Sequence, residues 1–131
     1  MGSKGNYRSP LARVRGLGAA KSGVEHWWLQ RASAIALLPL VIVFTAFAIS
    51  LTGASHAEVA AFLGRPLPAG VTILLVIAAF WHLKLGGQVI IEDYVSHEGV
   101  KLACVLALTF ATVAVGLACI LAVLRLVVAG A

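Results

Sequence analysis

The fold is decided by residues 71–94, VTILLVIAAFWHLKLGGQVIIEDY, which are apolar enough and numerous enough to cross a lipid bilayer as one helix. A bilayer core about 30 Å thick needs roughly 20 apolar residues in helical form. His82 and Lys84 nevertheless lie near the middle of this stretch, and Asp93 and Tyr94 lie at its end. Ionisable groups inside the hydrocarbon are costly and usually functional. The function of the chain is therefore expected in this segment.

The composition of the whole chain is that of a membrane protein. Hydrophobic residues make up 61% of the 131 residues and charged residues only 11%, whereas a soluble domain contains about 25% charged residues. We therefore predict an all-α membrane protein with three transmembrane helices, at residues 27–51, 67–91 and 100–128. Three thin helices enclose little core, so protein partners and membrane lipid are expected, and nucleic acid is not.

The first 26 residues are rich in basic side chains and glycine. Six of the ten Lys and Arg residues lie in positions 1–31, against Arg65 alone in the first connection. The positive-inside rule then places the N-terminus in the cytoplasm. We predict a basic cytoplasmic segment at residues 1–26, lying on the membrane surface, and a transmembrane domain at residues 27–131.

One stripe of the central helix carries an unusual set of residues. At 100° per residue, His82, Gly86, Val89 and Asp93 fall within about 60° of one another. An imidazole with a glycine one turn away suits axial ligation of a haem iron, because the macrocycle needs a nitrogen donor and room beside the backbone. The alternative is a histidine hydrogen-bonded to a neighbouring helix, with Gly86 as a helix-packing notch. The residues alone leave both interpretations open.

The run from His82 to Tyr94, HLKLGGQVIIEDY, resembles the signature H-x3-G-x6-D-Y of the smaller hydrophobic anchor subunit of succinate dehydrogenase. Residues 89–95, VIIEDYV, are similar to the alphaproteobacterial and mitochondrial branch in particular. Residues 8–23, RSPLARVRGLGAAKSG, and residues 26–31, HWWLQR, resemble the same branch. The similarity covers nearly the whole chain.

This resemblance implies an anchor in the bacterial inner membrane that holds a flavoprotein subunit and an iron–sulfur subunit of succinate dehydrogenase. The chain would share one b-type haem with a second hydrophobic anchor subunit and form part of a ubiquinone site. By resemblance, His82 is an axial haem ligand, Arg31 contacts the haem propionate region and Tyr94 hydrogen-bonds ubiquinone. Asp93 would orient the phenol of Tyr94 or relay a proton, or be a plain interfacial carboxylate. Alone, the polypeptide should catalyse nothing.

Other polar residues have weaker assignments. Lys84 lies about 160° from the direction of His82, on the opposite face of the helix, where a lysine snorkels or pairs with a partner helix. His97 is a candidate for proton uptake, and the role of His26 is open. Pro39 predicts a bend in the first helix.

Two rival functions remain at this stage. One is a cofactor-free structural or assembly subunit of a membrane complex, in which His82 only hydrogen-bonds between helices. The other is an anchor of a different b-haem quinone enzyme. The presence or absence of one b-type haem distinguishes a structural subunit from an anchor subunit of succinate dehydrogenase.

Overall fold

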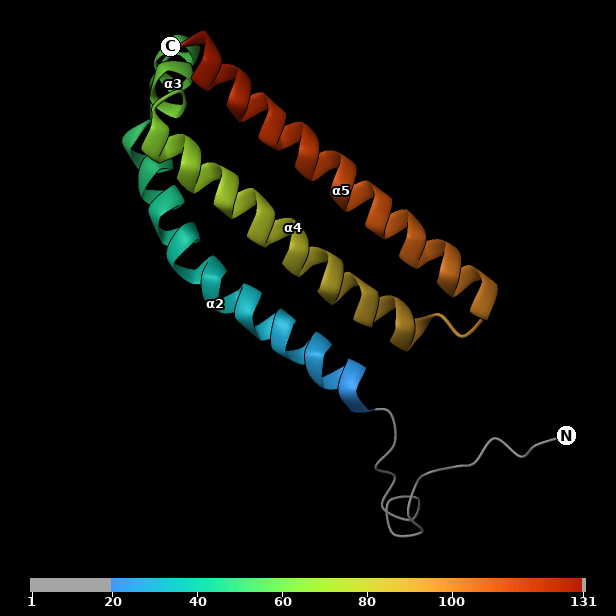
Figure 1. Cartoon of the computed structure of the whole chain (residues 1–131). Coiled ribbons are helices and arrows are strands. Elements are labelled where there is room, and N and C mark those ends of the chain that lie inside the picture. Colours follow the sequence, from blue (N-terminus) through green and yellow to red (C-terminus); the bar gives the residue numbers. More distant parts are fainter. Residues whose placement is uncertain (1–19, 131) are drawn as a thin grey trace, which may run out of the picture.

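The computed structural model describes residues 20–130 of the chain. These residues form four helices and no strand: α2 (Ala20–Ser50), α3 (His56–Leu63), α4 (Pro66–Tyr94) and α5 (Glu98–Ala129) (Figure 1). The three long helices are each long and apolar enough to cross a membrane. The predicted all-α membrane protein with three spans is thus confirmed, and the chain is a multi-pass membrane protein.

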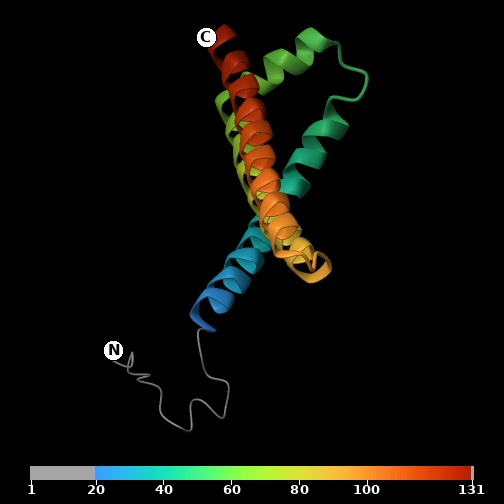
Figure 2. The ribbon, with the colours of Figure 1, turned by 90° about the vertical axis from the view of Figure 1, so that its right-hand side faces the viewer.

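The three long helices form a single layer with α4 in the middle. α4 packs against both α2 and α5, whereas no Cα atom of α2 comes within 8 Å of a Cα atom of α5 in the described residues. Figure 1 shows α4 between its two neighbours, and Figure 2 shows α2 crossing the α4–α5 pair at an angle. Both faces of this layer are therefore open to lipid or to partner proteins.

The helix ends differ in detail from the sequence expectation. α2 begins at Ala20, before the predicted start of the first span at residue 27. Residues 1–19, most of the predicted basic segment, lie outside the described residues. Pro39 lies inside α2, where it removes a backbone hydrogen bond and crowds the preceding turn, and Figure 1 shows α2 bending along its length. α4 begins at Pro66, because a proline at the first helical position loses no hydrogen bond.

The short helix α3 lies at the end of the layer that contains the C-terminal ends of α2 and α5. Ser55 caps it with a capping box: its backbone N donates to Glu58 Oε2 at 2.7 Å, and Glu58 N donates to Ser55 Oγ at 3.4 Å. The Phe62 ring meets the Phe47 ring of α2 edge to face, with centroids 5.1 Å apart. A Cβ on Gly64 would lie 2.9 Å from the carbonyl oxygen of Leu126 on α5. α3 is thus held against the ends of two long helices.

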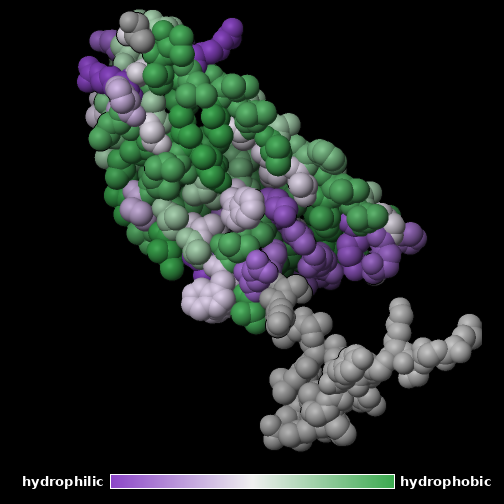
Figure 3. Space-filling view, in the orientation of Figure 1, coloured by the Kyte–Doolittle hydropathy of each residue, from purple (hydrophilic) through white to green (hydrophobic). Residues whose placement is uncertain are grey.

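The interior of the layer is thin. The buried hydrophobic side chains among the described residues are Ala69, Leu85 and Val123. Large apolar side chains cover the outside instead, as the green surface over the helices shows (Figure 3). This is the inverse of a soluble protein, and it leaves most of the apolar surface to be covered by hydrocarbon chains or by other subunits.

Candidate functional site

His82 on α4 is joined to α2 by a hydrogen-bonded pair. Its Nδ1 atom lies 3.0 Å from Ser33 Oγ, and Ser33 Oγ lies 2.8 Å from the carbonyl oxygen of Gln30, to which it donates. Ser33 is only 9% exposed. The bond uses one ring nitrogen of His82 and leaves Nε2 without a hydrogen bond to the described residues.

A hollow of about 290 Å³ opens beside His82 between α2 and α4. Its α2 wall is made by Trp27, Gln30, Arg31 and Ala34. Their spacing of i, i+3, i+4 and i+7 places them on one face of a helix. Two of the predicted site residues, His82 and Arg31, are therefore brought together at one opening.

Arg31 provides the positive charge of this hollow. Its guanidinium carbon lies 4.4 Å from the centre of the Trp27 ring, a cation–π contact that fixes the side chain without neutralising it. Arg31 is exposed and forms no ion pair with the described residues. The cation is thus available to an anionic group entering from outside the chain.

Gly86 lies one turn from His82 on α4, next to Gln30 of the hollow's wall. A Cβ built on Gly86 would be 3.7 Å from Gln30 Nε2, an ordinary contact, whereas one on Gly87 would be 2.8 Å from Leu108 Cδ2 of α5. Gly87, and not Gly86, is the position at which α4 approaches another helix closely. Helix packing in this chain therefore does not require a glycine at position 86.

Asp93 and Tyr94 lie apart from this hollow. Both are exposed at the end of α4, Tyr94 to 85%, and neither side chain hydrogen-bonds to the described residues. Tyr94 is twelve residues beyond His82, about 18 Å along a helix. The structure thus separates the predicted haem residues from the predicted quinone residues.

Lys84 faces a different space. It lines a second hollow of about 380 Å³ between α4 and α5, together with apolar side chains such as Phe80 and Val113. This agrees with the expectation that Lys84 points away from His82. Lys84 has no hydrogen bond or ion pair within the described residues.

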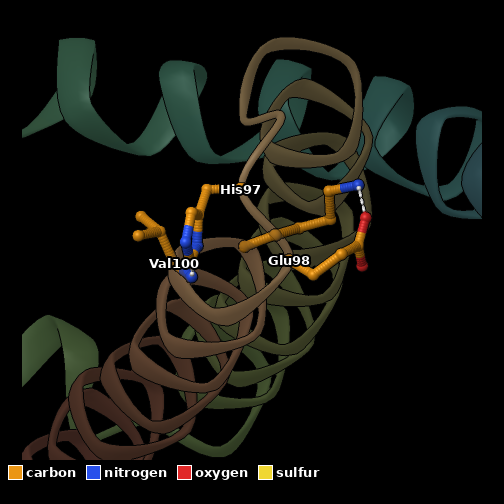
Figure 4. Close-up of polar contacts among 4 residues, drawn as sticks. His97, Glu98 and Val100 are labelled. Atoms are coloured by element: carbon orange, nitrogen blue, oxygen red, sulfur yellow. Dashed lines mark hydrogen bonds and ion pairs between the residues drawn. The ribbon is translucent and has the colours of Figure 1, made fainter.

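Two further histidines have surroundings of their own. His97 Nδ1 accepts from Val100 N at 3.4 Å and caps α5, next to an ion pair of 3.0 Å between Glu98 and Lys101 (Figure 4). His26 is half-buried, and its Nε2 atom is buried without a hydrogen-bond partner among the described residues.

Within residues 20–130, no group of three or more His, Cys, Asp and Glu side chains could hold a metal ion. An iron ligated by His82 would therefore take its other ligands from outside these residues, as a haem iron does from its macrocycle.

Ser33 and Gln30 were not predicted from the sequence. The available signal was weak: Ser33 is one small polar residue inside the apolar run that follows Arg31, and Gln30 shares a helix face with Trp27 and Arg31.

Comparison with known proteins identifies the family of this chain. Residues 5–116 match the profile of a family described as succinate dehydrogenase/fumarate reductase transmembrane subunit. The chain belongs to this family. A member of this family is one subunit of an enzyme complex, and the resemblance drawn from the motif at His82 is confirmed.

Individual relatives give the same result. The chain is 34% identical over 104 residues, 79% of its length and 81% of the relative, to the succinate dehydrogenase hydrophobic membrane anchor subunit of Paracoccus denitrificans. It is 30% identical over 118 residues, 90% of its length and 94% of the relative, to the protein of that name from Rickettsia bellii. No solved structure matches significantly.

Proposed function

We propose that this chain is the hydrophobic membrane anchor subunit of a succinate:ubiquinone oxidoreductase and that His82 is one axial ligand of a b-type haem. One observation carries the proposal: the imidazole of His82 and the cation of Arg31 line the same hollow, and Gly86, one turn from His82, adjoins Gln30 of its wall. The enzyme complex is inferred from the family to which the chain belongs, and the haem is inferred from the residues at the hollow.

The residues present fit a haem. His82 offers a nitrogen donor, Arg31 offers a cation for the propionate carboxylates, and Gly86 leaves room for a flat macrocycle beside the backbone. When bound, a haem supplies reversible one-electron transfer at its iron. This chain offers a single ligand at one open face, so the second ligand comes from a second hydrophobic anchor subunit packed on that face.

Tyr94 and Asp93 are proposed as one wall of the ubiquinone site. Tyr94 is 85% exposed, so its hydroxyl is available to a molecule held between this chain and its partners. The hydroxyl donates to a quinone oxygen, and this bond strengthens as negative charge develops there during reduction. Asp93 orients the phenol or relays a proton to the same oxygen.

The remaining partners follow from the same proposal. An iron–sulfur subunit and a flavoprotein subunit bind at the end of the layer that carries Tyr94, and electrons from succinate reach ubiquinone there. We place this end, with the basic N-terminal segment, on the cytoplasmic side of a bacterial inner membrane. Anionic lipid heads hold the basic segment at about 1 kcal/mol per basic residue.

The direct test is a reduced-minus-oxidised spectrum of the purified complex carrying His82→Leu. The b-type signal should disappear, while the chain remains inserted, because one imidazole matters little to insertion beside three apolar spans. His56→Leu is the matched control, since His56 is exposed at the start of α3, and its spectrum should be normal. An unchanged spectrum in His82→Leu would remove the ligand assignment, and a haem-free wild-type complex would favour a purely structural subunit.

A further inference from the structure

We propose that Ser33 is a positioning residue that selects the tautomer of His82 and directs its Nε2 lone pair toward the haem iron. The proposal rests on the haem function proposed above, but it concerns a residue of α2 that the motif on α4 does not contain. It follows from where the single proton of the Ser33 hydroxyl must lie.

A serine hydroxyl can donate one hydrogen bond, and Ser33 Oγ has two partners. The Gln30 carbonyl oxygen, 2.8 Å away, has no proton to give. If the hydroxyl proton pointed at His82 instead, two oxygen lone pairs would face each other at this distance. The proton therefore lies on the Gln30 side, and Ser33 Oγ accepts a hydrogen bond from His82 Nδ1 across 3.0 Å.

This direction decides the protonation pattern of the ring. A neutral imidazole has one N–H and one lone pair, so an N–H at Nδ1 leaves the lone pair at Nε2. A lone pair on a ring nitrogen is what an iron ligand needs, and histidine ligands generally donate their other N–H to a neighbouring acceptor. Here the acceptor is a neutral hydroxyl on another helix.

Ser33 is well placed for this task. It is 9% exposed, so water does not compete for the His82 proton. Its hydroxyl is tied to the backbone of its own helix, so the acceptor keeps its position when α2 and α4 pack. The ring of His82 is thereby oriented before any cofactor arrives.

Loss of the hydroxyl should weaken the ligand. In Ser33→Ala, the Nδ1–H faces a methyl group and the ring is free to turn or to change tautomer. Loss of such a supporting hydrogen bond typically costs roughly 10- to 100-fold in metal affinity. A less basic imidazole disfavours the ferric state more than the ferrous state. A tenfold loss confined to the ferric state raises the midpoint potential by about 59 mV.

The first experiment compares three variants of the whole complex by haem content and by spectroelectrochemical titration. Ser33→Ala should lose haem more readily and titrate at a higher potential. Ser33→Thr keeps a hydroxyl and should restore the wild-type potential. Ser50→Ala is the control, because Ser50 Oγ makes the same kind of bond, 2.8 Å to the Phe47 carbonyl, elsewhere on α2. Equal potentials in Ser33→Ala and Ser50→Ala would overturn the proposal.

The second experiment needs no haem. The full chain, with ¹⁵N-labelled histidine in lipid nanodiscs and without haem, reports by NMR which nitrogen of His82 carries the proton. A proton at Nδ1 that is lost or redistributed in Ser33→Ala supports the role of Ser33, and a proton at Nε2 in the wild type refutes it. If the complex proves to lack haem, the proposed function fails, while this measurement still decides whether Ser33 sets the tautomer.

Discussion

The guanidinium carbon of Arg31 lies 4.4 Å from the centre of the Trp27 ring, one turn away on the same face of α2. Such a contact contributes about 0.5 to 1 kcal/mol at an exposed site. It holds a full positive charge at the mouth of the hollow beside His82 without cancelling it. The cation therefore faces an anionic group that enters this opening.

Arg31→Gln should therefore weaken haem retention. A hydrogen bond to a charged group contributes about 1.5 to 3 kcal/mol, and because Arg31 is exposed we expect the lower end, roughly a tenfold loss of affinity. The amount of haem that stays in each complex after repeated detergent washing measures this loss of affinity. Arg125→Gln removes an exposed arginine near the end of α5 and should be without effect. Equal haem content in the two variants would show that Arg31 does not bind the propionates.

Gly86→Ala should separate the needs of the cofactor from those of helix packing. The added methyl group meets only Gln30 at ordinary contact distance, and alanine favours a helix by about 1 kcal/mol over glycine. The helices should therefore pack normally, while a macrocycle lying against residue 86 is displaced and haem is lost. Gly70→Ala is the matched control on α4, because nothing lies within 4 Å of its added methyl group. Full haem content in Gly86→Ala would place the macrocycle elsewhere.

Tyr94→Phe deletes one hydroxyl from a side chain that is 85% exposed. If this hydroxyl donates to the quinone, its loss should cost roughly 1 to 3 kcal/mol, about 5- to 150-fold in quinone affinity or turnover. Haem content should persist, because His82 is three helical turns away. Succinate oxidation with an artificial acceptor for the soluble subunits serves as the control and should be nearly normal. Normal quinone reduction would make Tyr94 an interfacial anchor only.

The capping box of α3 should give this helix a pH dependence. Hydrogen bonds from the Ser55 backbone N–H and then from its hydroxyl lower the pKa of Glu58 below its ordinary value of 4.5. Because the pKa of Glu58 is lower in the folded chain, its carboxylate stabilises α3 at pH values above the pKa of the unfolded chain. This stabilisation is lost as the pH falls through the pKa of the folded chain. Hydrogen exchange of the α3 amides should be slower in the wild type than in Glu58→Gln at neutral pH. The difference should shrink as the pH falls through the lowered pKa of Glu58; a difference independent of pH would rule out the carboxylate as its source.

The proposed orientation puts the two connections on opposite sides of the membrane. Ser96 lies between α4 and α5, and Thr52 lies between α2 and α3; both are exposed. An impermeant thiol reagent should label Ser96→Cys only from the cytoplasmic side and Thr52→Cys only from the other side. The wild-type chain, whose Cys104 and Cys119 lie within α5, sets the background. The reverse labelling pattern would invert the orientation.

The three spans were predictable because length and hydropathy alone specify a membrane helix. The short distance between His82 and Ser33 was not predictable, since it depends on how α2 is rotated and shifted against α4. In a soluble helix the apolar stripe reveals which face packs inward. Here nearly every face of α2 is apolar, so the sequence does not say that the face with Arg31 turns toward α4.

The assignment of His97 illustrates a different limit. A histidine in a polar connection next to Asp93 and Tyr94 suggests proton uptake, which stays a prediction, but the sequence did not indicate that its ring accepts from Val100 N and caps α5. Ser, Thr, Asp and Asn are the residues preferred as N-caps, so a histidine at this position did not suggest that a helix begins there.

The single-layer arrangement, with α4 between α2 and α5, has a consequence for synthesis. Each long helix packs on the long helix made just before it, and in the described part of the chain the packing that waits for a distant segment is that of α3 on the end of α5. Because chains fold from the N-terminus while they are still being made, we expect α2 and α4 to pair while α5 is still in the ribosome. The bond between Ser33 and His82 should then form early, so that the nascent chain presents its half of the proposed cofactor site before it is released.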